Sequence, residues 1–164
     1  MKTIQTIILT AAMAISGFAS AHEYKTDSLH IDHPWSKQVP PTSSVAAAFF
    51  SVMNHGDNDD VLLGASSPIA EKTELHAHIH ENGMMKMREV EQIEIPAHGT
   101  QMLKPGGYHI MFFGLNEVPK LGDSFPVTLN FKQAGMVEVD VKVEEATYMP
   151  EGGHSDKEMD HSHH

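Results

Sequence analysis

Two residue types that ligate metal ions, histidine and methionine, are frequent in this sequence. Its 164 residues include 13 His and 11 Met but no Cys. Imidazole together with the soft thioether sulfur is a donor combination suited to Cu(I). Because the sequence has no thiol, it cannot form a disulfide, a thiolate zinc site, an iron–sulfur cluster, a His₂Cys blue-copper site or a lipidated cysteine. The metal chemistry that stands out is therefore coordination by imidazole and thioether.

The segment around Asn82-Gly83 is expected to form a β-hairpin that gathers several of these side chains. Residues 74–80 alternate with the period of a strand, and Asn-Gly is the strongest short hairpin signal. A two-residue turn fixes the cross-strand partners as Glu81–Met84, His80–Met85, His78–Met87 and His76–Glu89. Side chains directly opposite or diagonal on such a pair lie about 4.5–8 Å apart, within reach of one ion. The His and Met residues that share one face are then His76, His78, His80, Met85 and Met87.

Two simpler interpretations of this face have to be weighed. A lone Met in a strand usually packs in a core, and alternating His often marks only a solvated polar surface. The other face of the same strand, however, already offers Leu75, Ala77 and Ile79 to a core. Burying three imidazoles without partners is costly, so the His/Met face is predicted to lie near solvent.

A second His/Met pair stands in a later predicted strand, residues 108–115. His109 and Met111 are two residues apart and project to the same face, whereas Ile110 and Phe112 face the other way. Two separate strands thus each offer His and Met. A His₂Met₂ set would hold Cu(I), whereas zinc prefers Cys, His and carboxylate ligands.

The elements that position these groups are predicted to be short strands. Apolar or alternating runs at 44–53, 60–65, 74–80, 108–115, 127–131 and 137–143 are separated by turn-forming clusters, and no long segment has a 3.6-residue period. This pattern favours an all-β fold, an antiparallel β-sandwich or barrel, that folds without metal. The predicted core is Val45, Phe49, Val52, Leu62, Leu75, Ile79, Ile110, Phe112, Leu129, Val139 and Val141.

The spacing of the candidate ligands resembles that of a known family. His76 is followed after ten residues by Met87, and Met87 after 21 residues by His109-x-Met111. This is the His-x₁₀-Met-x₂₁-His-x-Met pattern of the periplasmic Cu(A) chaperones written PCu(A)C. Flanking segments such as Thr73-Glu74-Leu75-His76 and Lys104-Pro105-Gly106-Gly107-Tyr108-His109 match as well, and the resemblance covers about residues 29–143.

The resemblance implies a cupredoxin-like β-sandwich without the cupredoxin's own copper site. It also implies a Cu(I) chaperone with the ligands His76, Met87, His109 and Met111. Such a protein loads the Cu(A) centre of cytochrome c oxidase subunit II, alone or with a Sco-type copper protein. One position departs from the family: where many relatives have Met two residues after the first ligand His, this chain has His78. That imidazole would add a nitrogen donor or favour Cu(II).

The N-terminal segment is typical of a secretory signal. Residues 1–21 combine Lys2, an apolar core and an Ala19-Ser20-Ala21 cleavage site. The apolar run is too short to cross a bilayer, which takes about 20 residues. We therefore expect a periplasmic domain over residues 22–149 that is not embedded in the membrane. The new N-terminus, His22, could chelate copper through its amine and imidazole, although an incidental first residue is the simpler interpretation.

Residues 150–164 are rich in His and acidic residues and offer little to a core, so they are predicted to form a disordered tail. Imidazoles on such a tail suit Cu(II), which tops the affinity order of divalent metals. Candidate secondary metal ligands, in the tail and on the hairpin, are His78, His80, Met85, His154, Met159, His161, His163 and His164.

Three classes of function remain. A net charge of −11 disfavours nucleic acid as a partner. A copper transfer protein leads, and a general copper-sequestering or resistance protein is the alternative. An enzyme, for example a copper oxygenase using His22, is disfavoured because one Trp and three Tyr offer little platform for a polysaccharide. We predict that the chain is not an enzyme and that it is a monomer.

Overall fold

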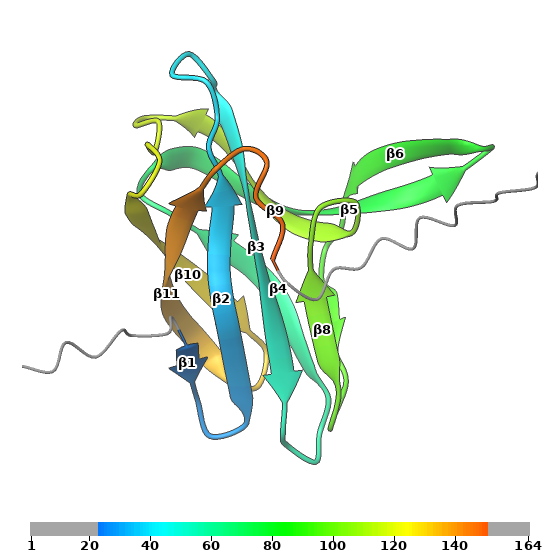
Figure 1. The fold of residues 1–164 in the computed structure, drawn as a ribbon. Coiled ribbons are helices and arrows are strands. Elements are labelled where there is room, and N and C mark those ends of the chain that lie inside the picture. Colours follow the sequence, from blue (N-terminus) through cyan, green and yellow to red (C-terminus); the bar gives the residue numbers. More distant parts are fainter. Residues whose placement is uncertain (1–22, 151–164) are drawn as a thin grey trace, which may run out of the picture.

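Eleven strands make up the part of the chain that the computed structural model describes, residues 23–150 (Figure 1). They are β1 (Glu23–Lys25), β2 (Leu29–Lys37), β3 (Val45–Asn54), β4 (Asp60–Ser66), β5 (Ala70–Glu81), β6 (Met84–Glu89), β7 (Ile93–Ile95), β8 (Thr100–Leu103), β9 (Tyr108–Leu115), β10 (Ser124–Phe131) and β11 (Gly135–Glu144). Within this range no helix is long and apolar enough to cross a membrane. The predicted signal segment and all but the first residue of the predicted tail lie outside the described residues.

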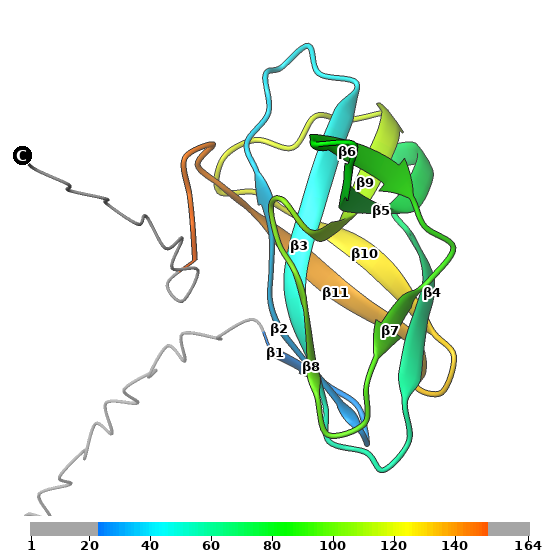
Figure 2. The ribbon, with the colours of Figure 1, turned by 90° about the vertical axis from the view of Figure 1, so that its right-hand side faces the viewer.

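The strands follow the order β6-β5-β9-β8-β3-β2-β11-β10-β4-β7, with β1 added beside β2. This sheet folds over between β2 and β11, so that β10, β11 and β4 face β2, β3 and β8 (Figure 2). The all-β sandwich is as predicted. The expectation that all pairing is antiparallel needs correction, because β11 pairs with β2, and β8 with β9, in parallel. β11 belongs to the second layer and pairs with β2 of the first layer. No hairpin connects these two strands, so nothing requires them to be antiparallel.

The core between the two layers contains most of the residues predicted from the alternation. In β3 the even-numbered residues face the core, with Val52 fully buried. Val45 was wrongly placed there, because it begins β3 on the opposite face and is exposed. Phe49 is buried on that outer face against Trp35, with ring centroids 4.7 Å apart. Ile79 is only half-buried, because β5 continues beyond the sandwich at this point.

The β5–β6 hairpin has the register that the Asn-Gly signal predicted. His80 pairs with Met85, and Glu81 with Met84, across the turn. Asn82 and Gly83 both have positive φ, 53° and 74°, which is the type I′ turn that matches the twist of the flanking strands. The hairpin projects from the upper part of the sandwich (Figure 1). Every residue of β6 is exposed.

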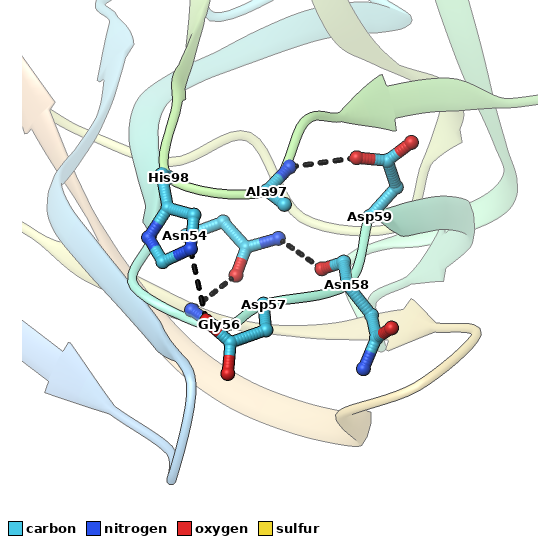
Figure 3. A network of polar contacts seen from close by, with 7 residues as sticks. All are labelled: Asn54, Gly56, Asp57, Asn58, Asp59, Ala97 and His98. Atoms are coloured by element: carbon cyan, nitrogen blue, oxygen red, sulfur yellow. Dashed lines mark hydrogen bonds and ion pairs between the residues drawn. The ribbon is translucent and has the colours of Figure 1, made fainter.

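The turn between β3 and β4, at the lower end in Figure 1, is fixed by the buried side chain of Asn54 (Figure 3). Its Nδ2 donates to the Asn58 carbonyl at 2.9 Å and to the Ile95 carbonyl at 3.2 Å, while its Oδ1 accepts from the Gly56 amide at 2.9 Å. Two further contacts complete the network: Asp59 with the Ala97 amide, and Asp57 with His98. These bonds satisfy the backbone groups of the turn, so Asn54 has a structural role.

Candidate metal centre

Three adjacent strands, β6, β5 and β9, bring the predicted copper ligands to one face of the sheet. His76 of β5 lies directly opposite His109 of β9, and Met111 lies two residues further along β9, opposite Glu74. On its other side β5 pairs with β6, which sets Met87 opposite His78. Because side chains two residues apart project to the same face, all of these groups share it. The spacing of the motif thus places its His and Met residues on three neighbouring strands, β6, β5 and β9, which we call the three-strand array.

Met87 and His109 come into contact although a strand separates them. The Met87 Sδ lies 3.1 Å from the His109 Nε2. An unbranched side chain with three rotatable bonds can reach across β5 in this way, which a β-branched residue could not. The rings of His76 and His109 have centroids 5.8 Å apart. The Met87 thioether thus contacts the His109 imidazole, and the His76 ring lies next to that of His109.

The tautomer of His109 can be inferred from its partners. Its Nδ1 lies 3.1 Å from the Gly107 carbonyl oxygen, which can only accept a hydrogen bond, so Nδ1 carries the proton. The Nε2 therefore has a free lone pair, and this lone pair faces the sulfur of Met87. Two lone pairs at this separation have no proton between them. A soft cation would satisfy both.

The tautomer of His76 can be inferred in the same way, from its contact with the carboxylate of Glu74. Its Nε2 lies 2.7 Å from the Oε2 of Glu74. The hydrogen bond from Lys72, and secondly that from His76, hold the pKa of the Glu74 carboxyl below its ordinary value, so the carboxylate accepts and Nε2 carries the proton. The remaining Nδ1 is buried and has no hydrogen-bond partner among residues 23–150. Carboxylate–histidine pairs of this kind orient imidazoles that ligate metals.

The predicted ligands differ sharply in exposure. His109 is 2% exposed, His76 8% and Met111 9%, whereas Met87 is 47% exposed. The expectation that the His/Met face of the hairpin lies near solvent is therefore wrong for His76, whereas His80, Met85 and Met87 are exposed as predicted. Aromatic rings cover the two buried imidazoles: Phe113 lies 5.7 Å from the His76 ring and Phe49 6.2 Å from the His109 ring, between centroids. The exposed side of the array is the hairpin strand β6.

The secondary candidates fall into three groups. His78 is half-buried at the edge of the array, with its ring 5.2 Å from that of His109 and its Nδ1 3.4 Å from the Gly107 carbonyl oxygen. His80 and Met85 are exposed on the outer part of the hairpin. The tail candidates, His154, Met159, His161, His163 and His164, lie outside the described residues.

The unfolding free energy of the metal-free domain is expected to fall as the pH drops below about 6.5. Burial lowers the pKa of His109 from its ordinary value of 6.5. The folded state then binds fewer protons than the unfolded state, so the stability present above 6.5 is lost as pH falls toward the folded-state pKa. An NMR titration of His109 should show a midpoint below 6.5, and a midpoint at or above 6.5 would contradict this.

Sequence reasoning missed several groups that surround possible metal ligands. Glu74 and the Gly107 carbonyl orient the two buried imidazoles, and they could have been noticed only as flanks of the motif.

A separate cluster was missed entirely: the ligand atoms of Glu23, His30 and Asp32 lie within 4.8 Å of one another. It depends on the pairing of the three-residue strand β1 with β2, which no local pattern indicates. These residues are largely exposed, and Lys25 pairs with Glu23.

Solved structures with similar folds include two that contain copper. The copper-bound PCuAC domain from PmoF2 matches with a TM-score of 0.65 and 26% identity, over 76% of this chain and 98% of that one. The solution structure of CuI-DR1885 from Deinococcus radiodurans matches with a TM-score of 0.59 and 29% identity, over 79% of this chain and 85% of that one. The predicted cupredoxin-like β fold is confirmed.

Curated relatives and a family model give the same extent of similarity. The chain is 34% identical over 122 residues to "Putative lipoprotein Lxx21020" of Leifsonia xyli, covering 74% of this chain and 72% of that protein. It is 28% identical over 119 residues to "Uncharacterized protein RP573" of Rickettsia prowazekii, covering 70% and 66%. The family model described as "Putative lipoprotein LpqE-like" matches residues 29–143, which is well over half of the chain. The chain therefore belongs to the LpqE-like family.

Proposed function

We propose that this protein is a copper chaperone that binds Cu(I) through His76, Met87, His109 and Met111. The observation that carries the proposal is a pair of imidazole nitrogens, His76 Nδ1 and His109 Nε2, that accept no hydrogen bond from the described residues. The first is buried without a hydrogen-bond partner in the described range, and the second faces the thioether of Met87. The copper in the two similar PCuAC structures supports the choice of metal.

The donor set favours Cu(I) over divalent ions. Thioether sulfur is a soft ligand that selects Cu(I), whereas zinc sites are built from Cys, His and carboxylate. The carboxylate that contacts His76, that of Glu74, is engaged by Lys72 and His76. It therefore orients His76 and is not a free ligand. The neutral imidazoles and uncharged thioethers also suit a single positive charge.

The arrangement suits transfer of the ion better than permanent retention. The core lies between the sheet layers and contains no metal ligand, so copper adds stability only by binding preferentially to the folded state. Met87, on the projecting hairpin, is the one exposed ligand. A recipient protein can replace this ligand first while the buried imidazoles still hold the ion.

The proposed location is the periplasm, and the proposed recipient is the Cu(A) centre of cytochrome c oxidase subunit II, reached directly or through a Sco-type protein. No catalytic activity is part of this proposal. Deletion of the gene should lower oxidase activity at limiting copper, with restoration by the wild-type gene and not by a Met87→Leu copy. If only copper tolerance falls, the protein is a sequestering or resistance protein instead.

The C-terminal residues are proposed to bind Cu(II) separately. Four His and one Met stand between residues 151 and 164, and imidazole-rich segments bind Cu(II) readily. Truncation after Met149 is expected to remove the strongest Cu(II) binding and to leave Cu(I) affinity unchanged. Calorimetric titration of both forms with each ion checks this. Unchanged Cu(II) binding would mean that Cu(II) binds at the hairpin His residues or at His22 instead of at the C-terminal residues.

A further inference from the structure

The outer end of the β5–β6 hairpin carries another His/Met pair, which the proposed copper site does not use. His80 and Met85 are Cα partners in the hairpin register. His80 is exposed, and Met85 is 50% exposed. Among residues 23–150, neither side chain has a hydrogen-bond or ion-pair partner, so contacts within this range do not explain a soft sulfur at this position.

The turn geometry brings these two side chains close together. In a two-residue hairpin the closing pair, here Glu81 and Met84, exchanges both backbone hydrogen bonds. The next pair, His80 and Met85, is then of the non-hydrogen-bonded kind, with Cα atoms about 4.5 Å apart and side chains nearest to one another. An imidazole and a thioether so placed can ligate one Cu(I).

The two faces of the hairpin are chemically distinct. His80 and Met85 project to the same face as the next pair inward, His78 and Met87, because each is two residues away along its strand. The opposite face carries charged pairs, with the Glu81 carboxylate 3.2 Å from Lys86 Nζ and 2.6 Å from an Arg88 nitrogen. Lys86 and Arg88 thus lie on the face of the hairpin opposite to the soft donors His80 and Met85.

The His/Met pairs form a row that leads from the tip to the buried ligands. A strand rises about 3.4 Å per residue, so consecutive pairs on one face are about 7 Å apart. Exposure decreases along the row, from Met85 through half-buried His78 to His109. At the inner end, Met87 Sδ already contacts His109 Nε2 at 3.1 Å. The ion can move one pair at a time by exchanging ligands, remaining Cu(I), with no proton or electron transferred.

We propose that His80 and Met85 form a second, weaker Cu(I) site at the hairpin tip, through which Cu(I) enters and leaves the inner site. The inference rests on the proposed function of His76, Met87, His109 and Met111. Two donors in an exposed position bind less tightly than four partly buried ones. Loading of the inner site therefore precedes stable occupation of the tip.

The test is an anaerobic Cu(I) titration of the full mature chain, followed by NMR of ¹³C-labelled methionine methyl groups. The first equivalent should shift the Met87 and Met111 methyls, and the second should shift Met85. Met84 is the internal control, since it is adjacent in sequence and 59% exposed but lies on the other face of the hairpin. Its methyl should stay unchanged.

Variants extend the test to affinity and exchange. Met85→Leu should weaken the second equivalent about tenfold, which corresponds to about 1.4 kcal/mol. It should also slow removal of Cu(I) from the inner site by a chelator. His80→Ala should do the same, and Met84→Leu should change neither quantity. His80 and Met85 are both exposed, so both variants should retain the fold. The dispersion of the NMR spectrum checks this.

Failure of this inference can be told apart from failure of the proposed function. The tip site is refuted if Met85 and Met84 respond alike, if a tail residue such as Met159 responds in place of Met85, or if Met85→Leu leaves both affinity and exchange unchanged. Absence of any Met87 and Met111 response to the first equivalent would instead refute the inner site, and with it the path from the tip.

Discussion

A Met87→Leu/Met111→Leu double variant is expected to fold and to lose Cu(I) affinity by about 10³-fold, which corresponds to about 4 kcal/mol of binding free energy. Leucine conserves the volume of methionine closely, so each exchange should cost less than about 1.5 kcal/mol of stability. Met87 is exposed and Met111 packs beside Glu74 on the strand face. The loss should arise because two imidazoles alone remain as ligands.

Competition with a chromophoric Cu(I) chelator measures the affinity, and urea unfolding measures the stability. Met84→Leu/Met102→Leu is the matched control, because both methionines are exposed, Met84 lies on the opposite face of the hairpin and Met102 lies on β8. The control should bind Cu(I) as the wild type does. Unfolding of the test variant would show that one of its methionines is a core residue.

Phe112→Ala is expected to destabilise the metal-free domain by about 3–5 kcal/mol, which is a large part of the stability of a domain this size. Phe112 directly follows Met111 but faces the core, where it is fully buried. Its ring meets Phe125 of the opposite layer edge-on, with centroids 5.5 Å apart. Removing it leaves a cavity that two packed layers cannot collapse around.

Urea unfolding should show a lower midpoint with an unchanged slope for Phe112→Ala. A loss below about 1 kcal/mol would mean that the two layers do not pack as described. Together with the Met87→Leu/Met111→Leu variant, this experiment separates the two faces of β9. One face is expected to determine copper binding, and the other is expected to determine folding.

Local patterns were sufficient to predict the part of the site that depends on one hairpin. The Asn82-Gly83 turn and the strand period fix which residues oppose one another, so the pairing of His78 with Met87 followed from the sequence. The placement of His109 and Met111 on one face followed equally from a two-residue spacing. These features require only nearest neighbours along the chain.

What depended on distant segments could not be predicted in the same way. The burial of His109 comes partly from Phe49 on β3, a strand that pairs with β9. The parallel pairing of β2 with β11 joins the first and last long strands. The exposure of Val45 reflects which face of β3 meets the opposite layer. Each is decided by the three-dimensional packing of strands far apart in sequence.

The central claim is that the Cu(I) ion is held by thioethers and imidazoles together, and X-ray absorption of the Cu(I)-loaded domain tests it most directly. With one equivalent bound to residues 22–149, we predict both sulfur and nitrogen scatterers around copper at neutral pH. The sulfur signal should weaken clearly in the Met87→Leu/Met111→Leu variant, in which Met85 at the hairpin tip is the thioether that still stands opposite a His. It should remain at full strength in the Met84→Leu/Met102→Leu control. A spectrum with nitrogen or oxygen scatterers alone in the wild-type protein would contradict the account.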